Sequence, residues 1–302
     1  MIQYLYLRRV DYGEALRLQQ ELVALRQAGC IDNVLLLLEH PPVLTLGRNA
    51  SRSNILASDE LLAARGVTLH EINRGGDVTY HGPGQLIGYP IFDLRSLRNA
   101  KGTRLGPVDF VRQMEEALIR VCGDFGVRAG RICGLTGVWC GLPEPQSASG
   151  EPNCEAPNSS NGLPPAGRGR KIAAIGIHVA RGVTSHGFAF NVTTNLQDFA
   201  LINPCGITDR PVTSLEREVA DSKTLPSLES LAHAAARHFG AVFIEPIALV
   251  EDLAALRALA DSRPDSQFHD SPAPIFPAQD TPLQIPSEIE RLRHRKNRPV
   301  SA

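Results

Sequence analysis

One cysteine has a setting that suits a nucleophile, in the segment Asn-Pro-Cys-Gly-Ile at residues 203–207. Pro204 fixes the backbone before Cys205, and Gly206 leaves space beside the sulfur. Buried structural cysteines normally lie within an apolar strand or helix, whereas Cys205 is predicted at a turn. The thiolate is the reactive form, so a catalytic Cys205 would need a base or a cation nearby. A free cysteine is more often a small core residue, and the residues alone leave that alternative open.

Lys171 could supply the charge that a thiolate needs, since it begins the apolar segment Lys-Ile-Ala-Ala-Ile-Gly-Ile-His-Val. Only four of the 31 basic residues are lysines. Because arginine keeps its proton and a desolvated lysine can release it, this lysine suits a group that must titrate. A solvated lysine at a strand edge is the simpler alternative. His81 and His186 are other candidate partners for Cys205, although each alone is more simply explained as a hydrogen-bonded structural histidine.

A third unusual segment, Arg-Gly-Gly-Asp-Val-Thr-Tyr-His-Gly-Pro-Gly-Gln-Leu, occupies residues 74–86. Glycine costs backbone entropy, so a cluster of four indicates a chain that turns sharply or closely approaches another group. The flanks 69–73 and 86–94 have strand character. We therefore predict a strand–loop–strand crossing with polar groups at its bend, and a plain glycine-rich hairpin is the alternative.

Three blocks occur in one order along the chain, at residues 74–90, 169–192 and 203–206. Together they resemble the octanoyl-acyl-carrier-protein:protein N-octanoyltransferases, or lipoyl(octanoyl) transferases, of the lipoate–protein ligase B type. The resemblance extends over about residues 3–245. It implies an α+β fold of the biotin/lipoate protein ligase type (class II aminoacyl-tRNA synthetase/biotin synthetase-like), with a mixed sheet and flanking helices. It also implies an acyltransferase that moves an octanoyl or lipoyl group to protein lysines.

The resemblance assigns roles to individual residues. In that family, the cysteine that matches Cys205 carries the acyl group as a thioester, and the lysine that matches Lys171 lowers the pKa of that cysteine. An octanoyl chain suits a slot of small and apolar residues with hydrogen-bond donors at its mouth. The residues implied to line this slot are Arg74, Gly75, Gly76, Asp77, Val78, Thr79, Tyr80, His81, Ala174, Ile175, Gly176, Gly187, Phe188 and Ala189.

The implied partners are the phosphopantetheine arm of octanoyl-acyl carrier protein and the lipoyl domains of 2-oxoacid dehydrogenases and glycine cleavage H protein. Exchange of one thioester for another is nearly isoenergetic, so no ATP, cofactor or metal is expected. An ATP-dependent lipoate–protein ligase, a lipoyl amidotransferase and a non-catalytic module that binds lipoyl domains stay open as alternatives. The Asn-Pro-Cys-Gly block argues against the ligase, which activates free acid as an adenylate without a cysteine nucleophile.

The elements that must hold these residues can be predicted from apolar periodicity. Strands are predicted at 2–9, 33–40, 43–47, 135–141, 171–182 and 184–192, and helices at 11–29, 58–65, 107–126 and 227–241. This mixture predicts one α+β catalytic domain over residues 1–250. The Pro/Ser/Asn-rich segment 142–169 is predicted to be a flexible insertion, and residues 251–302 a largely disordered extension.

Composition narrows the function classes further. The 302-residue chain has a net charge of −1 and is 43% hydrophobic, which gives no general attraction to nucleic acid or membrane. It contains no bilayer-length apolar run and no signal-peptide pattern at its start, so we expect a cytoplasmic protein. The six cysteines include no C-x-x-C pair. Cys133, Cys140 and Cys154 are expected to be ordinary thiols rather than disulfides or metal ligands.

Overall fold

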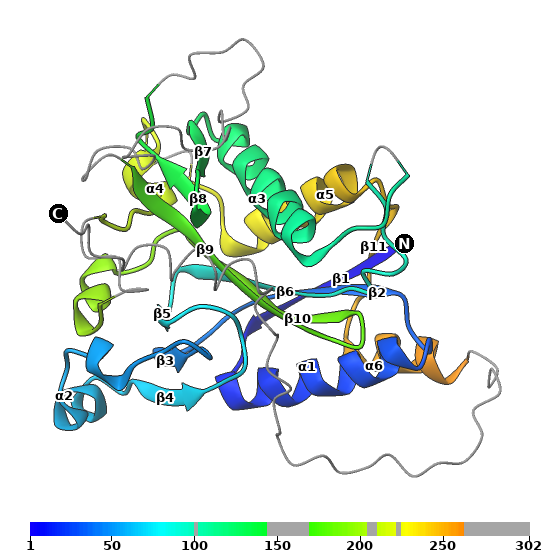
Figure 1. The fold of residues 1–302 in the computed structure, drawn as a ribbon, viewed down its shortest axis with the longest axis horizontal. Helices are drawn as coiled ribbons and strands as arrows, with labels where there is room; N and C mark the ends of the chain where they lie inside the picture. The colour runs from blue at the N-terminus through cyan, green and yellow to red at the C-terminus, as the bar shows by residue number, and fades with distance from the viewer. Residues whose placement is uncertain (100–101, 144–168, 204–209, 222–224, 263–302) are drawn as a thin grey trace, which may run out of the picture. The chain divides into compact units, whose positions relative to one another are not determined.

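The computed structural model describes residues 1–99, 102–143, 169–203, 210–221 and 225–262. Its centre is an eight-stranded mixed sheet (Figure 1). Across the sheet the strands are β11 (Ile247–Leu249), β1 (Ile2–Arg9), β2 (Asn33–Glu39), β6 (Gln85–Ile91), β10 (Val183–Asn191), β9 (Arg170–Ala180), β8 (Leu135–Cys140) and β7 (Ala129–Ile132). β1 pairs in parallel with β11 and β2, and the remaining neighbours are antiparallel.

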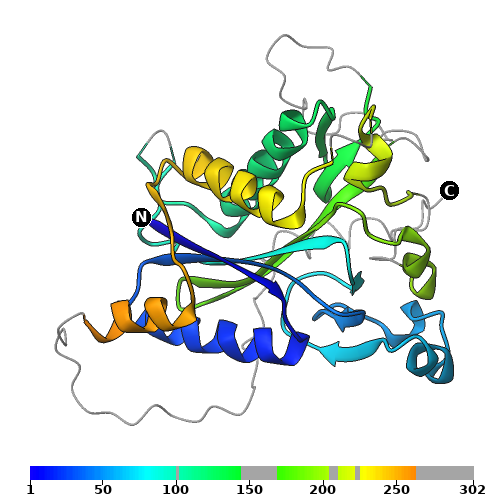
Figure 2. The same cartoon turned by 180° about the vertical axis from the view of Figure 1, so that it is seen from behind.

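Helices cover both faces of this sheet. α3 (Pro107–Asp124) and α5 (Leu228–Phe243) lie on one face, and α1 (Tyr12–Gln27) and α6 (Leu253–Asp261) lie on the other (Figures 1 and 2). The Asp11 side chain caps α1 by accepting hydrogen bonds from the amides of Gly13 and Glu14. The side chain that precedes α1 therefore marks the start of this helix.

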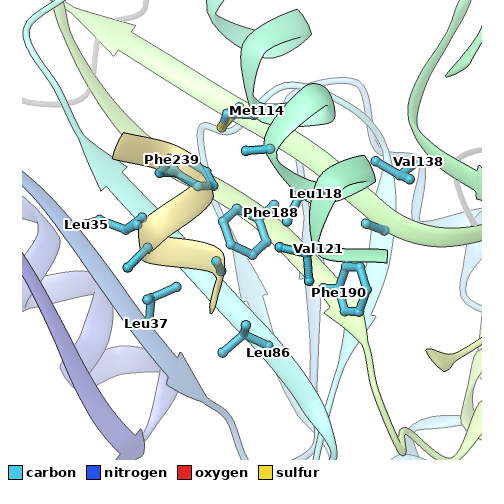
Figure 3. Close-up of a cluster of buried hydrophobic side chains, with 14 of the residues drawn as sticks. Leu35, Leu37, Leu86, Met114, Leu118, Val121, Val138, Phe188, Phe190 and Phe239 are labelled. Atoms are coloured by element: carbon cyan, nitrogen blue, oxygen red, sulfur yellow. The ribbon is translucent and has the colours of Figure 1, made fainter. Parts of the chain in front are cut away.

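The continuous apolar run of β2 is explained by burial on both faces. Leu35 and Leu37 belong to the core beneath α3 and α5, where they lie near Phe188 and Phe239 (Figure 3). Leu36 and Leu38 belong to the core beneath α1 and α6. Alternate residues of a strand point to opposite faces, so a strand between two helical layers has no polar side.

A smaller three-stranded sheet lies beside the main one. Its strand order is β4 (Thr68–Glu71), β3 (Val43–Leu46), β5 (Val78–His81), with β3 parallel to β4 and antiparallel to β5. The short helices α2 (Asp59–Ala64) and α4 (Leu215–Glu218) and the 3₁₀ segments η1 (Arg52–Asn54) and η2 (Leu196–Leu201) complete the described elements. No helix in the described part of the chain is long and apolar enough to cross a membrane.

The predicted strands and helices are present, and the structure differs from the prediction in three places. The stretch 74–86 is not one loop, because its Val-Thr-Tyr-His core forms β5 against β3. Strand β7 was not predicted. The compact unit runs from Met1 to Arg263, so it extends beyond residue 250 into the segment expected to be disordered. Beyond residue 250, Leu256 of α6 is fully buried, and just before it β11 pairs with β1, which is distant in sequence. Residues 144–168 of the predicted insertion and 263–302 of the predicted extension lie outside the described residues.

Candidate active site

Two adjoining pockets contain most of the residues singled out in the sequence. The first, here called the lysine pocket, has a volume of about 470 Å³ with its open mouth included. It is lined by Thr79, Gln85, Trp139, Lys171, Ala174, Ala189, Asn191, Phe199, Arg210 and Val212. The second, the glycine pocket, has about 500 Å³. It is lined by Tyr12, Arg74, Gly75, Gly76, Thr79, His81, Tyr89, Ala174, Ile175, Gly176, His186, Gly187, Phe188 and Ala189. Thr79, Ala174 and Ala189 line both pockets, so the two adjoin at these residues.

The floor of the glycine pocket is made by two paired strands. Residues 174–176 of β9 lie opposite residues 187–189 of β10, with Gly176 facing Gly187 across the ladder. The loop at Gly75 packs directly on this floor, because the Gly75 amide donates to the carbonyl of Ile177 at 3.0 Å. A Cβ atom at Gly176 would lie 2.8 Å from the Gly75 carbonyl oxygen, closer than real contacts allow. The glycines therefore permit close backbone approach, and the Gly75 amide is used within the protein rather than offered to a ligand.

Alternation along β5 decides which of its residues reach a pocket. Thr79 and His81 face the pockets, while Val78 and Tyr80 are buried in a separate apolar cluster with Phe199. The Tyr80 hydroxyl donates to Asp198 at 2.9 Å. Asp77 accepts from the Val78 amide and from the Asn54 side chain. Asp77, Val78 and Tyr80 thus line neither pocket and instead hold the glycine-rich segment in place.

Arg74 lines the glycine pocket but uses its guanidinium to brace the loop. Its Nη2 donates to the Thr45 carbonyl at 2.7 Å, and its Nη1 donates to the Gly75 carbonyl at 3.0 Å. The side chain is buried. Arg74 therefore ties β3 to the Gly75–Gly76 backbone, which is the arrangement that a narrow slot requires.

A directed hydrogen-bond chain connects the two pockets. His81 Nδ1 donates to Gln85 Oε1 at 2.9 Å, and Gln85 Nε2 donates to Asn191 Oδ1 at 2.8 Å. Asn191 Nδ2 then donates to the Thr213 carbonyl at 2.9 Å, and the Thr213 amide donates to the Lys171 carbonyl. In this series of hydrogen bonds, each side-chain amide accepts through its oxygen and donates through its nitrogen. His81 therefore orients the polar residues of the lysine pocket.

The buried histidines around the glycine pocket are neutral. Burial is the main cause that lowers the pKa of both His81 and His186 to about 3, and the nearby positive charge of Arg74 adds to it. Burial also lowers the pKa of His40 to about 4. His186 Nε2 bonds to Asn73 Oδ1, and His40 lies between the Val10 carbonyl and the Tyr89 hydroxyl. This part of the site is consequently polar without titrating near neutral pH.

Lys171 is held by the backbone on both sides. Its amide donates to the Pro211 carbonyl and its carbonyl accepts from the Thr213 amide, both at 2.9 Å. Its partner across the β8–β9 ladder is Trp139, and its Nζ lies 4.7 Å from the centre of the Trp139 ring. Arg210 lines the same pocket. The lysine pocket therefore places one titratable cation beside an aromatic face.

Comparison with known proteins agrees with this geometry. Residues 11–240 match the lipoyl protein ligase A/B catalytic domain family. The chain is 57% identical to an octanoyltransferase of Acidobacterium capsulatum over 80% of its own length and 90% of the relative's. It is 51% identical to an octanoyltransferase of Koribacter versatilis, with coverage of 84% and 88%. The chain belongs to the octanoyltransferase family. It is therefore an acyltransferase, as the sequence blocks predict.

Solved structures confirm the predicted type of fold for this octanoyltransferase. A bipartite lipoate protein ligase of Thermoplasma acidophilum superposes with a TM-score of 0.59 at 16% identity, covering 86% of this chain and 91% of the other. A lipoate-protein ligase A bound with ATP superposes with a TM-score of 0.58 at 17% identity, covering 86% and 93%. At these identities the likeness concerns the fold alone.

Cys205 lies outside the described residues of the octanoyltransferase. The described chain stops at Asn203 and resumes at Arg210, which lines the lysine pocket. Two other cysteines are poor nucleophiles, because burial raises the pKa of Cys140 to about 12 and that of Cys122 well above its usual value. Cys133 is disulfide-bonded, which corrects the expectation that it is an ordinary thiol.

Several lining residues were not predicted. Trp139, Gln85 and Asn191 enter the lysine pocket, and Tyr12 and Tyr89 enter the glycine pocket. Gln85 belongs to the glycine-rich block and could have been included on that ground. The tyrosines come from α1 and β6, and only the packing of these elements around the slot shows that they line it.

Proposed function

We propose that this octanoyltransferase moves an octanoyl group from octanoyl-acyl carrier protein to a lysine of a lipoyl domain, through a thioester on Cys205. The observation that carries the proposal is that the two pockets adjoin at Thr79, Ala174 and Ala189. An acyl chain in the glycine pocket would bring its carbonyl end to the lysine pocket. Small residues where the pockets adjoin leave room for a slender chain, and this shape matches the substrate.

In the first half-reaction, the Cys205 thiolate attacks the thioester carbonyl of the carrier's phosphopantetheine arm. The carbon–sulfur bond to the carrier breaks, and the departing thiolate takes a proton from the Lys171 ammonium. The acyl group is then held on Cys205, and Lys171 is neutral. The positive charge of Lys171 stabilises the thiolate before the attack, as a nearby cation does for reactive cysteines.

In the second half-reaction, a lysine amine of the lipoyl domain attacks the Cys205 thioester. Lys171 accepts the proton that this amine loses, and the Cys205 thiolate leaves, so the starting ion pair is restored. Gln85 and Asn191, hydrogen-bonded in series from His81, are two of the polar groups that the described part of the chain brings to the same pocket. They are candidates to position the carbonyl and the incoming amine.

Lipoyl domains are proposed as acceptors on chemical grounds and by analogy. The Thermoplasma acidophilum ligase of similar fold is described together with its E2 lipoyl domain. The acceptor must offer an exposed lysine, because its amine has to enter the lysine pocket beside Lys171. An ATP-dependent ligase of this fold is the second candidate, and it makes a different prediction for the covalent intermediate.

Intact-protein mass measurement after mixing with octanoyl-acyl carrier protein, without ATP, tests the proposal. We expect one octanoyl adduct on the wild-type enzyme and on Cys30→Ser, and none on Cys205→Ser, because a serine hydroxyl is far less ionised than a thiol at neutral pH. An adduct that persists in Cys205→Ser removes the proposed thioester. The absence of any adduct, combined with turnover of free octanoate and ATP, would favour the ligase.

A further inference from the structure

The proposed chemistry uses Lys171 but gives no role to the Trp139 ring beside it. Trp139 is the chain's only tryptophan, its side chain is 1% exposed, and it lines the lysine pocket. The Lys171 Nζ stands over the indole at 4.7 Å from the ring centre, within the range of a cation–π interaction. An aromatic ring attracts an ammonium and gains nothing comparable from a neutral amine. The ring therefore distinguishes the two protonation states of Lys171.

The backbone before Trp139 is anchored so that the ring is held at this place. The β8–β9 register shifts between Val138 and Trp139, which is a bulge. Gly137 has a φ of 126° and its amide donates to Glu115 Oε1 at 2.9 Å. A Cβ atom at Gly137 would lie 2.6 Å from the Ala173 carbonyl oxygen, so only glycine allows β8 to approach β9 here.

Glu115 is itself fixed, so the anchor does not depend on one contact. Its carboxylate is fully buried and bonds to Arg112 at 2.8 Å and to Arg131 at 3.2 Å. The indole N–H of Trp139 is buried and has no acceptor in the part of the chain that the structure describes. Within the described residues, the position of the ring is thus set by the backbone and by packing over Lys171.

We infer that Trp139 is a positioning residue for Lys171, which holds the ammonium over its ring in the lysine pocket before the first half-reaction and again after the second. The inference rests on the proposed function. Among the described residues, the charged or titratable groups near Lys171 include Arg210 in the same pocket, Cys140 beside Trp139 and the Arg170–Glu218 ion pair, and the proposed mechanism adds the Cys205 thiolate. The aromatic face of Trp139 supplies an attraction that favours the charged form of Lys171.

The single tryptophan makes this inference directly measurable. Excitation of Trp139 in the wild-type enzyme reports protonation of the amine beside it, so its emission is expected to change through one titration step at alkaline pH. Lys171→Met should lack this step. Competitive acylation of amines followed by peptide mass measurement gives the midpoint of the same group independently, with the three other lysines as internal references.

Two substitutions distinguish the effect of the aromatic ring of Trp139 on Lys171 from the effect of its N–H group. Trp139→Leu removes the aromatic face, and we expect the Lys171 midpoint to fall by about one unit. Trp139→Phe keeps a weaker face and removes the N–H, so it should show a smaller fall. The alkaline limb of the pH profile for Cys205 adduct formation should move by the same amount, whereas a purely structural defect would lower the rate at every pH.

An unchanged Lys171 midpoint in folded Trp139→Leu would overturn the inference. If that variant does not fold, the wild-type emission step decides, since a step that persists in Lys171→Met would show that Trp139 does not sense Lys171. These outcomes are independent of the proposed function, because amine labelling and emission do not require a thioester. Conversely, an adduct in Cys205→Ser would remove the thioester mechanism and leave the Trp139–Lys171 coupling intact.

Discussion

The neutral histidines of the glycine pocket lead to a prediction about acid stability. Burial lowers the pKa of His81 from 6.5 to about 3. In the unfolded chain His81 returns to about 6.5, so between these values the unfolded state binds more protons than the folded state. The contribution of His81 to stability is therefore complete above pH 6.5 and is lost progressively as the pH falls.

The size of the effect follows from the two pKa values. At pH 5 the unfolded histidine is about 97% protonated while the folded one is neutral, which costs about 2 kcal/mol for His81. His186 has the same shift and adds a similar amount. The sum is a large share of a typical folding free energy of roughly 5–15 kcal/mol. Carboxylates titrate mainly below this window, so the interval from pH 6.5 to 5 isolates the histidines.

Urea denaturation at pH 8, 6.5 and 5 can measure this contribution. His81→Asn keeps a donor for Gln85 Oε1 and does not titrate, so between pH 8 and 5 it should lose about 2 kcal/mol less than the wild type. Tyr12→Phe is the matched control, because it alters the same pocket without removing a group that titrates in acid. Parallel losses in His81→Asn and the wild type would refute the reasoning, since they would show that His81 titrates normally in the folded protein.

Three further outcomes are expected. Lys171→Arg should still form some Cys205 adduct but stall in passing the acyl group to a lipoyl domain, because arginine cannot accept the proton of the incoming amine. Single-turnover mass measurement separates the two steps. Near-wild-type rates in both steps would exclude the role of Lys171 as a base. Gly176→Ala should displace the Gly75 backbone and impair adduct formation, and a fully active variant would contradict the close packing. Gly123→Ala, with open space around it in α3, should leave activity unchanged and raise the free energy of unfolding by about 0.5–1 kcal/mol. Calorimetry and rates of adduct formation check both variants. A short Gly/Ser linker in place of residues 142–169 should leave the melting temperature and the acylation step unchanged, and a fall of many degrees would show that the segment packs on the core.

Local sequence determined much of the framework. The alternation and apolar runs of β2, β9 and β10 predict strands because side chains on a strand alternate with a period of two. The predicted lining segments 174–176 and 187–189 lie opposite each other, because a hairpin with the Arg181–Gly182 turn sets their register. The glycine-rich block could be identified as a close-packing segment, since few residues other than glycine allow such approach.

Other properties depend on contacts between elements that are distant in sequence. Whether Thr79 or Tyr80 faces a pocket depends on the pairing of β5 with β3, since a shift of one residue would exchange the two sides. The neutrality of His81 and His186 depends on burial among α1, β6 and β10, which no local pattern specifies. The role of Trp139 depends on the bulge in β8 and on Glu115 in α3. Sequence periodicity specifies which face of an element is apolar, but the distances that decide protonation and positioning arise only when those faces pack together.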